Sequence, residues 1–197
     1  MKEKYKRMKK RIWSILLTIC MCVTLMPSAG SLAASSNLLE DSSKIGSLEA
    51  GVPKYGNGWS WDGDETLKLY GADLKAGDGE TIITTSLMGL NIEVQNYNRI
   101  TVDGNGSFID FERTRTVISG SGILDINLKD EKSKFIKTEN SQVEYKGGYI
   151  RVLGNGYLFA DEMTAEDGTV SNGFAEFYMQ GGYIDAPDAK FECRDVY

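Results

Sequence analysis

The chain has 197 residues, of which 22 are Lys or Arg and 28 are Asp or Glu, and it contains no histidine. The lack of histidine excludes His-based catalytic triads, His metal sites and His general bases. The net charge of −6 argues against nucleic acid and anionic membrane surfaces as partners.

The N-terminal segment, from Met1 to Ala34, shows the order of zones that is typical of a secretory signal peptide. Basic residues up to Arg11 precede an apolar run from Ile12 to Met26, and small residues follow. The run is shorter than the roughly 20 residues needed to cross a bilayer, so we expect a signal-peptide helix cleaved after Ala33 or Ala34. Cleavage removes seven of the 22 basic and one of the 28 acidic residues, leaving 15 and 27, a net charge of −12. We therefore expect a secreted or cell-surface protein.

Two of the three cysteines lie in this apolar segment, which leaves Cys193 alone in the exported part. The sequence thus predicts no intrachain disulfide. A lone cysteine is most often a small core hydrophobe.

Residues 35 to 55 are rich in Ser and only weakly apolar, which predicts a flexible lead-in. An alternative is that Leu38, Leu39, Ile45 and Leu48 form a short amphipathic piece over the first layer of the fold. The folded domain is expected over residues 56 to 197.

The domain opens with a strand, a Gly/Asp turn and a second strand, between Tyr55 and Leu69. Trp59 and Trp61 are two residues apart, so both side chains face the same side of a strand. They either cover an exposed end of the fold or form a platform for a sugar ring. The first interpretation is favoured because the position begins the ordered region.

One aliphatic core position recurs through the rest of the chain, at Leu74, Ile100, Leu124, Ile150 and Ile184. The first three steps are nearly equal, and the last step is longer. Short strands and Gly/Asn turns at such periods are typical of a β-solenoid. The tetrapeptide Gly-Gly-Tyr-Ile occurs at 147–150 and again at 181–184, which favours a solenoid over the alternative β-sandwich.

The solenoid is expected to have about five coils, stacked about 4.8 Å apart. The five recurring aliphatic residues would form one inward ladder, and a second would contain Val102, Ile126 and Val152. The strands of the other faces are expected at 90–94, 108–111, 135–136, 143–145, 157–159 and 174–177.

The last interval contains additional residues near 161–169. Such residues must leave the stack as a loop, and loops on a rigid solenoid often carry binding sites. Two groups of carboxylates are candidate Ca²⁺ ligands: Asp62 with Asp64, and Asp161, Glu162, Glu166 and Asp167 in the loop. An ordinary turn is the favoured interpretation of Asp62 and Asp64, and no other cofactor is expected.

Tyr149 and Tyr183 occupy equivalent places in the two Gly-Gly-Tyr-Ile segments, so they should stack on adjacent coils. One interpretation is an aromatic ladder that stabilises strand pairing. The other is a flat strip, together with Tyr145 and Tyr178, along which a polysaccharide could lie.

Two stretches resemble a known family. Residues 99–111, RITVDGNGSFIDF, resemble the coil motif of single-stranded right-handed parallel β-helix proteins, a group that includes pectate lyases, polygalacturonases and many non-enzymatic bacterial surface proteins. Residues 59–74, WSWDGDETLKLYGADL, are similar to the opening of carbohydrate-binding-type β-helix domains of secreted Gram-positive bacterial proteins. The resemblance covers about residues 56 to 186 and implies a right-handed parallel β-helix that binds carbohydrate.

The catalytic residues of the family have no counterparts here. Its hydrolases are expected to carry adjacent aspartates and a Gly-His-Gly segment, and its lyases an Arg or Lys base beside Ca²⁺. This chain has no Asp-Asp pair and no histidine. We therefore expect an exported non-catalytic module that binds carbohydrate or acts as a surface or adhesion element. The alternatives are a small polysaccharide lyase or glycoside hydrolase, and a structural spacer or fragment of a larger surface protein.

The C-terminal stretch after Ile184 shows no obvious cap for the last coil. An uncovered coil has an unpaired strand edge, and such edges associate. The sequence therefore predicts either self-association through this end or a longer gene product.

Overall fold

The computed structural model describes residues 43–164, 170–172, 175–193 and 195–197. Within these ranges side chains are described for 43–160, 175–193 and 196–197. The predicted signal peptide and the tip of the long loop lie outside them. The described part is all-β, and it contains no helix that is long and apolar enough to span a membrane.

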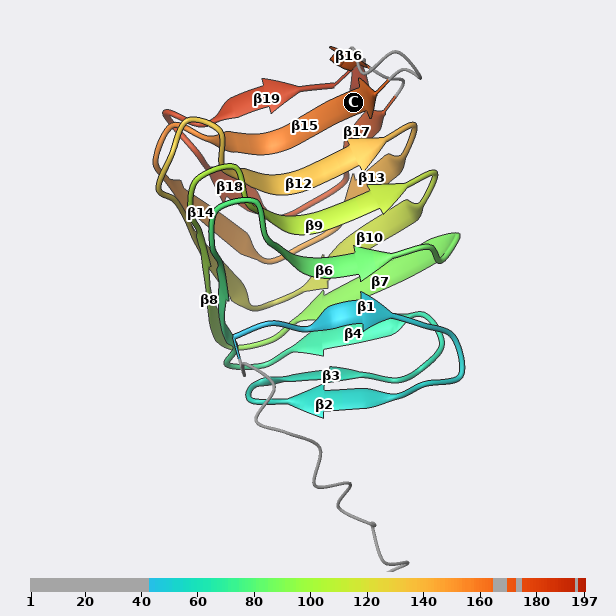
Figure 1. Cartoon of the computed structure of the whole chain (residues 1–197). Coiled ribbons are helices and arrows are strands. Elements are labelled where there is room, and N and C mark those ends of the chain that lie inside the picture. The colour runs from blue at the N-terminus through green and yellow to red at the C-terminus, as the bar shows by residue number, and fades with distance from the viewer. Residues whose placement is uncertain (1–42, 165–169, 173–174, 194) are drawn as a thin grey trace, which may run out of the picture. The chain divides into compact units, whose positions relative to one another are not determined.

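Three sheets form the walls of a solenoid (Figure 1). Sheet A contains β1 (Gly46–Leu48), β6 (Thr81–Thr85), β9 (Ser107–Glu112), β12 (Lys134–Glu139), β15 (Tyr157–Thr164), β16 (Val170–Asn172) and β19 (Lys190–Glu192). Sheet B contains β2 (Lys54–Gly56), β3 (Trp59–Trp61), β4 (Thr66–Leu69), β7 (Gly89–Val94), β10 (Arg115–Gly120), β13 (Gln142–Tyr145), β17 (Glu176–Met179) and β20 (Asp195–Val196). Sheet C contains β5 (Asp73–Ala76), β8 (Tyr97–Val102), β11 (Ile123–Leu128), β14 (Tyr149–Leu153) and β18 (Tyr183–Asp185).

The chain passes from sheet C to sheet A to sheet B and then begins the next turn, so that equivalent strands pair in parallel. The result is a right-handed parallel β-helix of about four turns. The five predicted coils correspond to the five strands of sheet C, which four turns connect. The predicted β-solenoid is confirmed, and the alternative β-sandwich is wrong.

The strands predicted for the other two faces are confirmed as β7, β9, β12, β13, β15 and β17. Their inward side chains join those of sheet C in one apolar core. Phe108 and Phe135 stack on adjacent turns with their ring centroids 5.0 Å apart. The core is therefore built from aliphatic and aromatic ladders that run along the stack.

The predicted inward ladder of sheet C is correct in part. Leu74 pairs with Ile100, and Ile150 pairs with both Leu124 and Ile184, as expected. The predicted neighbours Ile100 and Leu124 do not pair, however, because Ile100 faces Ile126. The true ladder through Leu74 is therefore Leu74, Ile100, Ile126 and Val152, which follow one another at a constant interval along the chain.

The reason for the shift is a buried polar residue. Leu124 pairs with Asn98, whose side chain is completely buried. A shift of two residues leaves every side chain on the same face of its strand, so it preserves the hydrophobic pattern. The sequence pattern alone therefore did not reveal it.

The N-terminal end is more ordered than predicted. β1 pairs with β6 in parallel, and Ile45 and Leu48 are buried in the core. The expected flexible lead-in to residue 55 is therefore wrong from residue 43 onward. The alternative, in which these residues lie over the first layer, is correct for Ile45 and Leu48, although Leu48 belongs to β1 and Ile45 directly precedes it. Leu38 and Leu39 lie outside the described residues.

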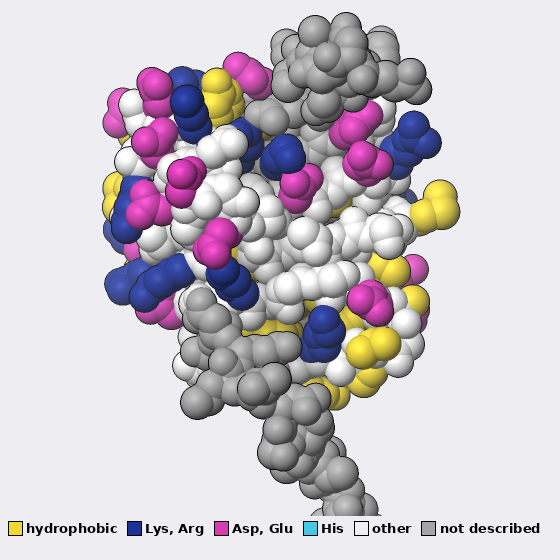
Figure 2. All heavy atoms as spheres, in the orientation of Figure 1, with side chains coloured by type: hydrophobic (Ala, Val, Ile, Leu, Met, Phe, Trp, Pro, Cys, Tyr) yellow, Lys and Arg dark blue, Asp and Glu magenta, His cyan; other side chains and the backbone are white. Residues whose placement is uncertain are grey.

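An antiparallel meander covers sheet B at this end. β2 pairs with β3, and β3 pairs with β4, which is the first strand of sheet B to pair in parallel. Hydrophobic side chains gather at the lower end of the molecule over β2 and β3 (Figure 2), where Val52 and Tyr55 are exposed. The stack thus begins with a three-stranded cap.

The predicted insertion also leaves the coil. β15 extends to Thr164 and pairs antiparallel with β16, so the described residues on the two sides of the insertion lie beside each other outside the parallel stack. Asp161 and Glu162 lie on β15, but their side chains are outside the described residues, as are Glu166 and Asp167.

Candidate functional site

The outer face of sheet C carries a row of alternating charges. The register aligns one charged residue from each of its five strands: Asp73, Arg99, Asp125, Arg151 and Asp185. We call this the charge row. Every carboxylate in it lies beside a guanidinium on a neighbouring strand, an arrangement that favours parallel pairing in this register.

Asp125 is the most enclosed member of the charge row, since only 8% of the residue is exposed. Its carboxylate accepts a hydrogen bond from Arg151 Nε at 2.7 Å and another from the Tyr97 hydroxyl. The hydrogen bond from Arg151 is the main reason why the pKa of Asp125 lies below its usual range. Asp125 is therefore an ionised, fully engaged carboxylate.

A second row, mostly aromatic, lies beside the charge row on the same face. It contains Tyr97, Ile123, Tyr149 and Tyr183 and is here called the tyrosine row. Tyr149 and Tyr183 stack with their ring centroids 5.5 Å apart and their planes at 25°. This stacking confirms the prediction from the two Gly-Gly-Tyr-Ile segments. Tyr183 is 62% exposed and Tyr97 is 44% exposed, so both rings are accessible.

Hydrogen bonds connect the two rows in the same way twice. The Tyr97 hydroxyl of β8 donates to Asp125 of β11, and the Tyr149 hydroxyl of β14 donates to Asp185 of β18 at 3.3 Å. Burial, and then the charge of Asp185, raises the pKa of Tyr149 above its ordinary value. Each of these tyrosines is therefore held by the carboxylate of the next strand, which fixes the orientation of its ring.

A groove of about 620 Å³ continues this face toward the N-terminal end of the stack. Its lining includes Asp73 of the charge row, and also Lys75 and Thr101, which pair with each other in the third outward row of sheet C. Lys129 also lines the groove and forms an ion pair with Asp103 at 3.2 Å. Both signs of charge are present here, and acidic and basic side chains also intermingle on the face shown in Figure 2.

Comparisons with family models, curated proteins and solved structures gave no match. The residues of this chain alone therefore indicate its function.

The structure buries three of the six predicted carbohydrate-binding residues. Trp59 is 5% exposed, Trp61 is 0% exposed and Tyr145 is 1% exposed. Trp61 Nε1 donates to the carbonyl of Glu49 at 3.1 Å, and the Tyr145 hydroxyl donates to the carbonyl of Tyr183 at 3.4 Å. None of the three rings presents a face to solvent. The sugar-platform interpretation is therefore wrong for the tryptophans, which cover the end of the fold.

The remaining predicted tyrosines do not form one strip. Tyr178 belongs to sheet B, where it stacks on Tyr197 with their ring centroids 4.7 Å apart. Tyr149 and Tyr183 belong to sheet C. Only the latter two contribute to the tyrosine row. The same face also contains Tyr97, Asp125 and Arg151, which the sequence analysis did not predict as site residues. A strictly constant repeat would have aligned Asp125 and Arg151 with Arg99.

The first pair of candidate Ca²⁺ ligands, Asp62 and Asp64, lies in an ordinary turn. Asp62 Oδ1 accepts hydrogen bonds from the backbone N–H groups of Asp64 at 2.8 Å and Thr66 at 3.0 Å. Partial burial opposes ionisation of Asp62, but the N–H of Thr66 and that of Asp64 hold its pKa below the usual range. In the described part of the chain, no group of three or more carboxylate or cysteine side chains is arranged to hold a metal ion.

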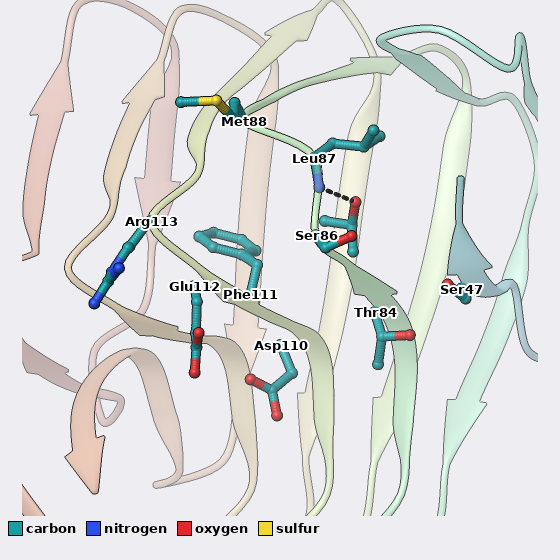
Figure 3. A pocket seen from close by; sticks show the side chains of 10 residues that line it. Ser47, Thr84, Ser86, Leu87, Met88, Asp110, Phe111, Glu112 and Arg113 are labelled. Atoms are coloured by element: carbon teal, nitrogen blue, oxygen red, sulfur yellow. Dashed lines mark hydrogen bonds between the residues drawn. The ribbon is translucent and has the colours of Figure 1, made fainter. Parts of the chain in front are cut away.

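A second hollow, of about 570 Å³, lies at the corner between β6 and β7 (Figure 3). Phe111 and Leu87 contribute its apolar part, and Met88 is 86% exposed at its edge. The Leu87 N–H donates to Thr85 Oγ1 at 3.1 Å, which fixes the corner. Asp110, on the same wall, is already paired with Lys137 at 2.8 Å.

Proposed function

We propose that this protein is an exported, non-catalytic β-helix module that binds a polysaccharide along the outer face of sheet C. The observation that carries the proposal is the tyrosine row beside the charge row. It places three tyrosine rings, of which those of Tyr97 and Tyr183 are exposed, beside hydrogen-bonding groups on the strands of one sheet.

The chemistry of the two rows suits a chain of sugar rings. Aromatic rings offer a flat apolar surface, and the C–H faces of a sugar ring can stack on it. Carboxylates accept hydrogen bonds from sugar hydroxyls, and guanidinium groups donate to sugar oxygens. Strands repeat about every 4.8 Å along the stack and the charges alternate, so like charges recur on every second strand, a regular spacing that an extended polymer can follow.

The state of the carboxylates supports binding rather than hydrolysis. A general acid needs a carboxyl group whose pKa is raised by burial or by a like charge. The pKa of Asp125 is instead lowered, with Arg151 as the main cause. The most enclosed carboxylate of this face is therefore suited to holding a hydrogen-bond network in place.

The export part of the proposal rests on the N-terminal basic, apolar and small-residue zones of the sequence. A regular, rigid stack of strands with an acidic net charge is compatible with a surface or adhesion role outside the cell.

A binding assay on neutral and acidic polysaccharides tests the proposal, combined with assays for new reducing ends and new unsaturated ends. We expect retention of at least one polysaccharide without new ends. Tyr183→Ala should weaken retention roughly 3- to 10-fold, because it removes an exposed stacking ring. Tyr55→Ala is the matched control, since Tyr55 is 76% exposed on β2, away from sheet C.

The other outcomes would each favour a different function or a different binding face. New reducing or unsaturated ends would indicate an enzyme, and the absence of binding to any polysaccharide would favour a structural spacer. If Tyr55→Ala weakened retention as much as Tyr183→Ala, sheet C would not be the binding face.

A further inference from the structure

Among the described residues, apolar side chains are exposed at the C-terminal end of the solenoid. In sheet A the inward Phe159 is 0% exposed, whereas its partner on the last turn, Phe191, is 37% exposed. In sheet B the exposure rises from 4% at Phe177 to 62% at its partner Val196. Ile184 of sheet C is also only half-buried. All three walls therefore present apolar side chains at the same end.

The opposite end of the stack is different. There the β2–β3 hairpin extends sheet B and buries Trp59 and Trp61. In sheet C the backbone N–H of Lys75 on the first strand already donates to the carbonyl of Ser43 at 2.9 Å. In sheets B and C a head-to-tail contact between copies would have to displace these elements, so it is not favoured.

The last strand of sheet A is complementary to itself. β19 consists of Lys190, Phe191 and Glu192. If two copies of β19 pair antiparallel and centred on Phe191, Lys190 of each copy lies opposite Glu192 of the other. Opposite charges that face each other across a strand pair stabilise it, and the two Phe191 rings meet on the inner side.

Two of the three side chains of β19, those of Phe191 and Glu192, are placed for such a contact. Glu192 is half-buried and forms no ion pair with another described residue. The Lys190 side chain is exposed, and its ammonium lies 4.7 Å from the centre of the Tyr157 ring and donates to the carbonyl of Glu131 at 3.4 Å, so it has to rotate away from these two partners to reach the second copy. Phe191 is anchored on the inner side, because its ring stacks on Phe159 with the centroids 5.5 Å apart.

We propose that the C-terminal end of the solenoid binds the C-terminal end of a second copy of this chain, with β19 pairing antiparallel to its counterpart. A two-fold axis through this pair makes the contact isologous and closed. The same axis places β18 of one copy beside β20 of the other. Ile184 then lies near the second copy's Val196, and the open core of each copy is covered by the other. This contact is independent of polysaccharide binding.

Charge reversal tests the contact in the full chain, with sedimentation velocity and light scattering as the measurements. The unmodified protein should give a dimer of twice the 21.8 kDa chain, less any processed segment. Lys190→Glu alone and Glu192→Lys alone should each weaken dimerisation roughly tenfold, since each replaces two attractive pairs with two repulsive ones. The double variant Lys190→Glu/Glu192→Lys should restore the dimer, because the reversed strand is again complementary to itself.

Mixing the two single variants provides the sharpest arm of the test. A strand with two acidic residues should pair with a strand with two basic residues, so the mixture should form a heterodimer that neither variant forms alone. Lys132→Glu is the matched control, because it makes the same change in net charge at an exposed corner residue. A monomer at all concentrations, a dimer indifferent to the single reversals, or failure of the double variant to restore it would overturn the proposal.

Discussion

Leu124 pairs with Asn98, and this one pair sets the register of sheet C. Asn98 Oδ1 accepts hydrogen bonds from the backbone N–H groups of Gly71 at 2.8 Å and Ala72 at 3.0 Å on the previous turn. Its Nδ2 donates to the carbonyl of Gln95 at 2.8 Å and to that of Ile123 at 3.4 Å on the next turn. A single buried amide therefore connects three successive turns.

Replacing this amide should be costly. Asn98→Leu leaves the buried N–H of Ala72 without its acceptor, so we expect the free energy of unfolding to fall by about 2–4 kcal/mol. Denaturant unfolding followed by circular dichroism measures the change. Asn127→Leu is the control, because Asn127 is exposed on the next strand of the same sheet and should cost less than about 0.5 kcal/mol. Equal losses in both variants would show that the amide has no special role.

Asp125 should make stability depend on pH. The hydrogen bond from Arg151 lowers the pKa of this carboxyl in the folded state. Its stabilising contribution is therefore complete above the unfolded-state pKa of about 3.9 and is lost as the pH falls through the lower folded-state pKa. We expect Asp125→Asn to reduce the free energy of unfolding by about 1–2 kcal/mol at neutral pH, and by progressively less below about pH 4.

Denaturant unfolding of the unmodified protein and of the Asp125→Asn variant, from neutral pH to below about pH 4, measures the difference in the free energy of unfolding. Asp73→Asn is the control, because Asp73 is an exposed member of the same row on the first strand. A difference for Asp125→Asn that stays constant down to the lowest pH would mean that its ionised carboxylate does not stabilise the fold.

The two tryptophans of the domain should behave as core residues. Since Trp59 and Trp61 are buried, we expect blue-shifted fluorescence that neither acrylamide nor a bound polysaccharide quenches. Trp61→Ala should lower the free energy of unfolding by about 3–5 kcal/mol. Ready quenching by acrylamide would contradict the burial. Quenching by a polysaccharide but not by acrylamide would indicate that the tryptophans belong to the binding surface.

Two corner glycines allow steric crowding to be separated from backbone strain. Gly120 and Gly71 have φ angles of +115° and +127°, which side-chain-bearing residues rarely adopt. A Cβ on Gly120 would lie 2.1 Å from the carbonyl oxygen of Val94, whereas a Cβ on Gly71 would meet nothing within 4 Å. We expect Gly120→Ala to cost at least about 1 kcal/mol more than Gly71→Ala in thermal or denaturant unfolding. Equal costs would mean that neighbouring turns do not restrict this corner.

The sequence by itself determined the architecture. Aliphatic residues recur at nearly constant intervals, and Gly-rich corners separate short strands, so equivalent segments had to stack. The pairing of Tyr149 with Tyr183 followed directly from the two Gly-Gly-Tyr-Ile segments.

Hydrophobic alternation left the register of sheet C open, and the tertiary structure decided it together with the exposed face. A slip of two residues keeps every apolar side chain inside, so hydrophobic alternation does not distinguish Ile126 from Leu124 as the neighbour of Ile100. The choice depends on hydrogen bonds between turns that Asn98 makes. That choice places Arg99 beside Asp125 and Tyr97 beside Ile123, and it thereby creates the two rows of sheet C. Packing between turns likewise decided that Trp59, Trp61 and Tyr145 are buried. Alternation along a strand shows which residues share a face, but it does not show which face is covered.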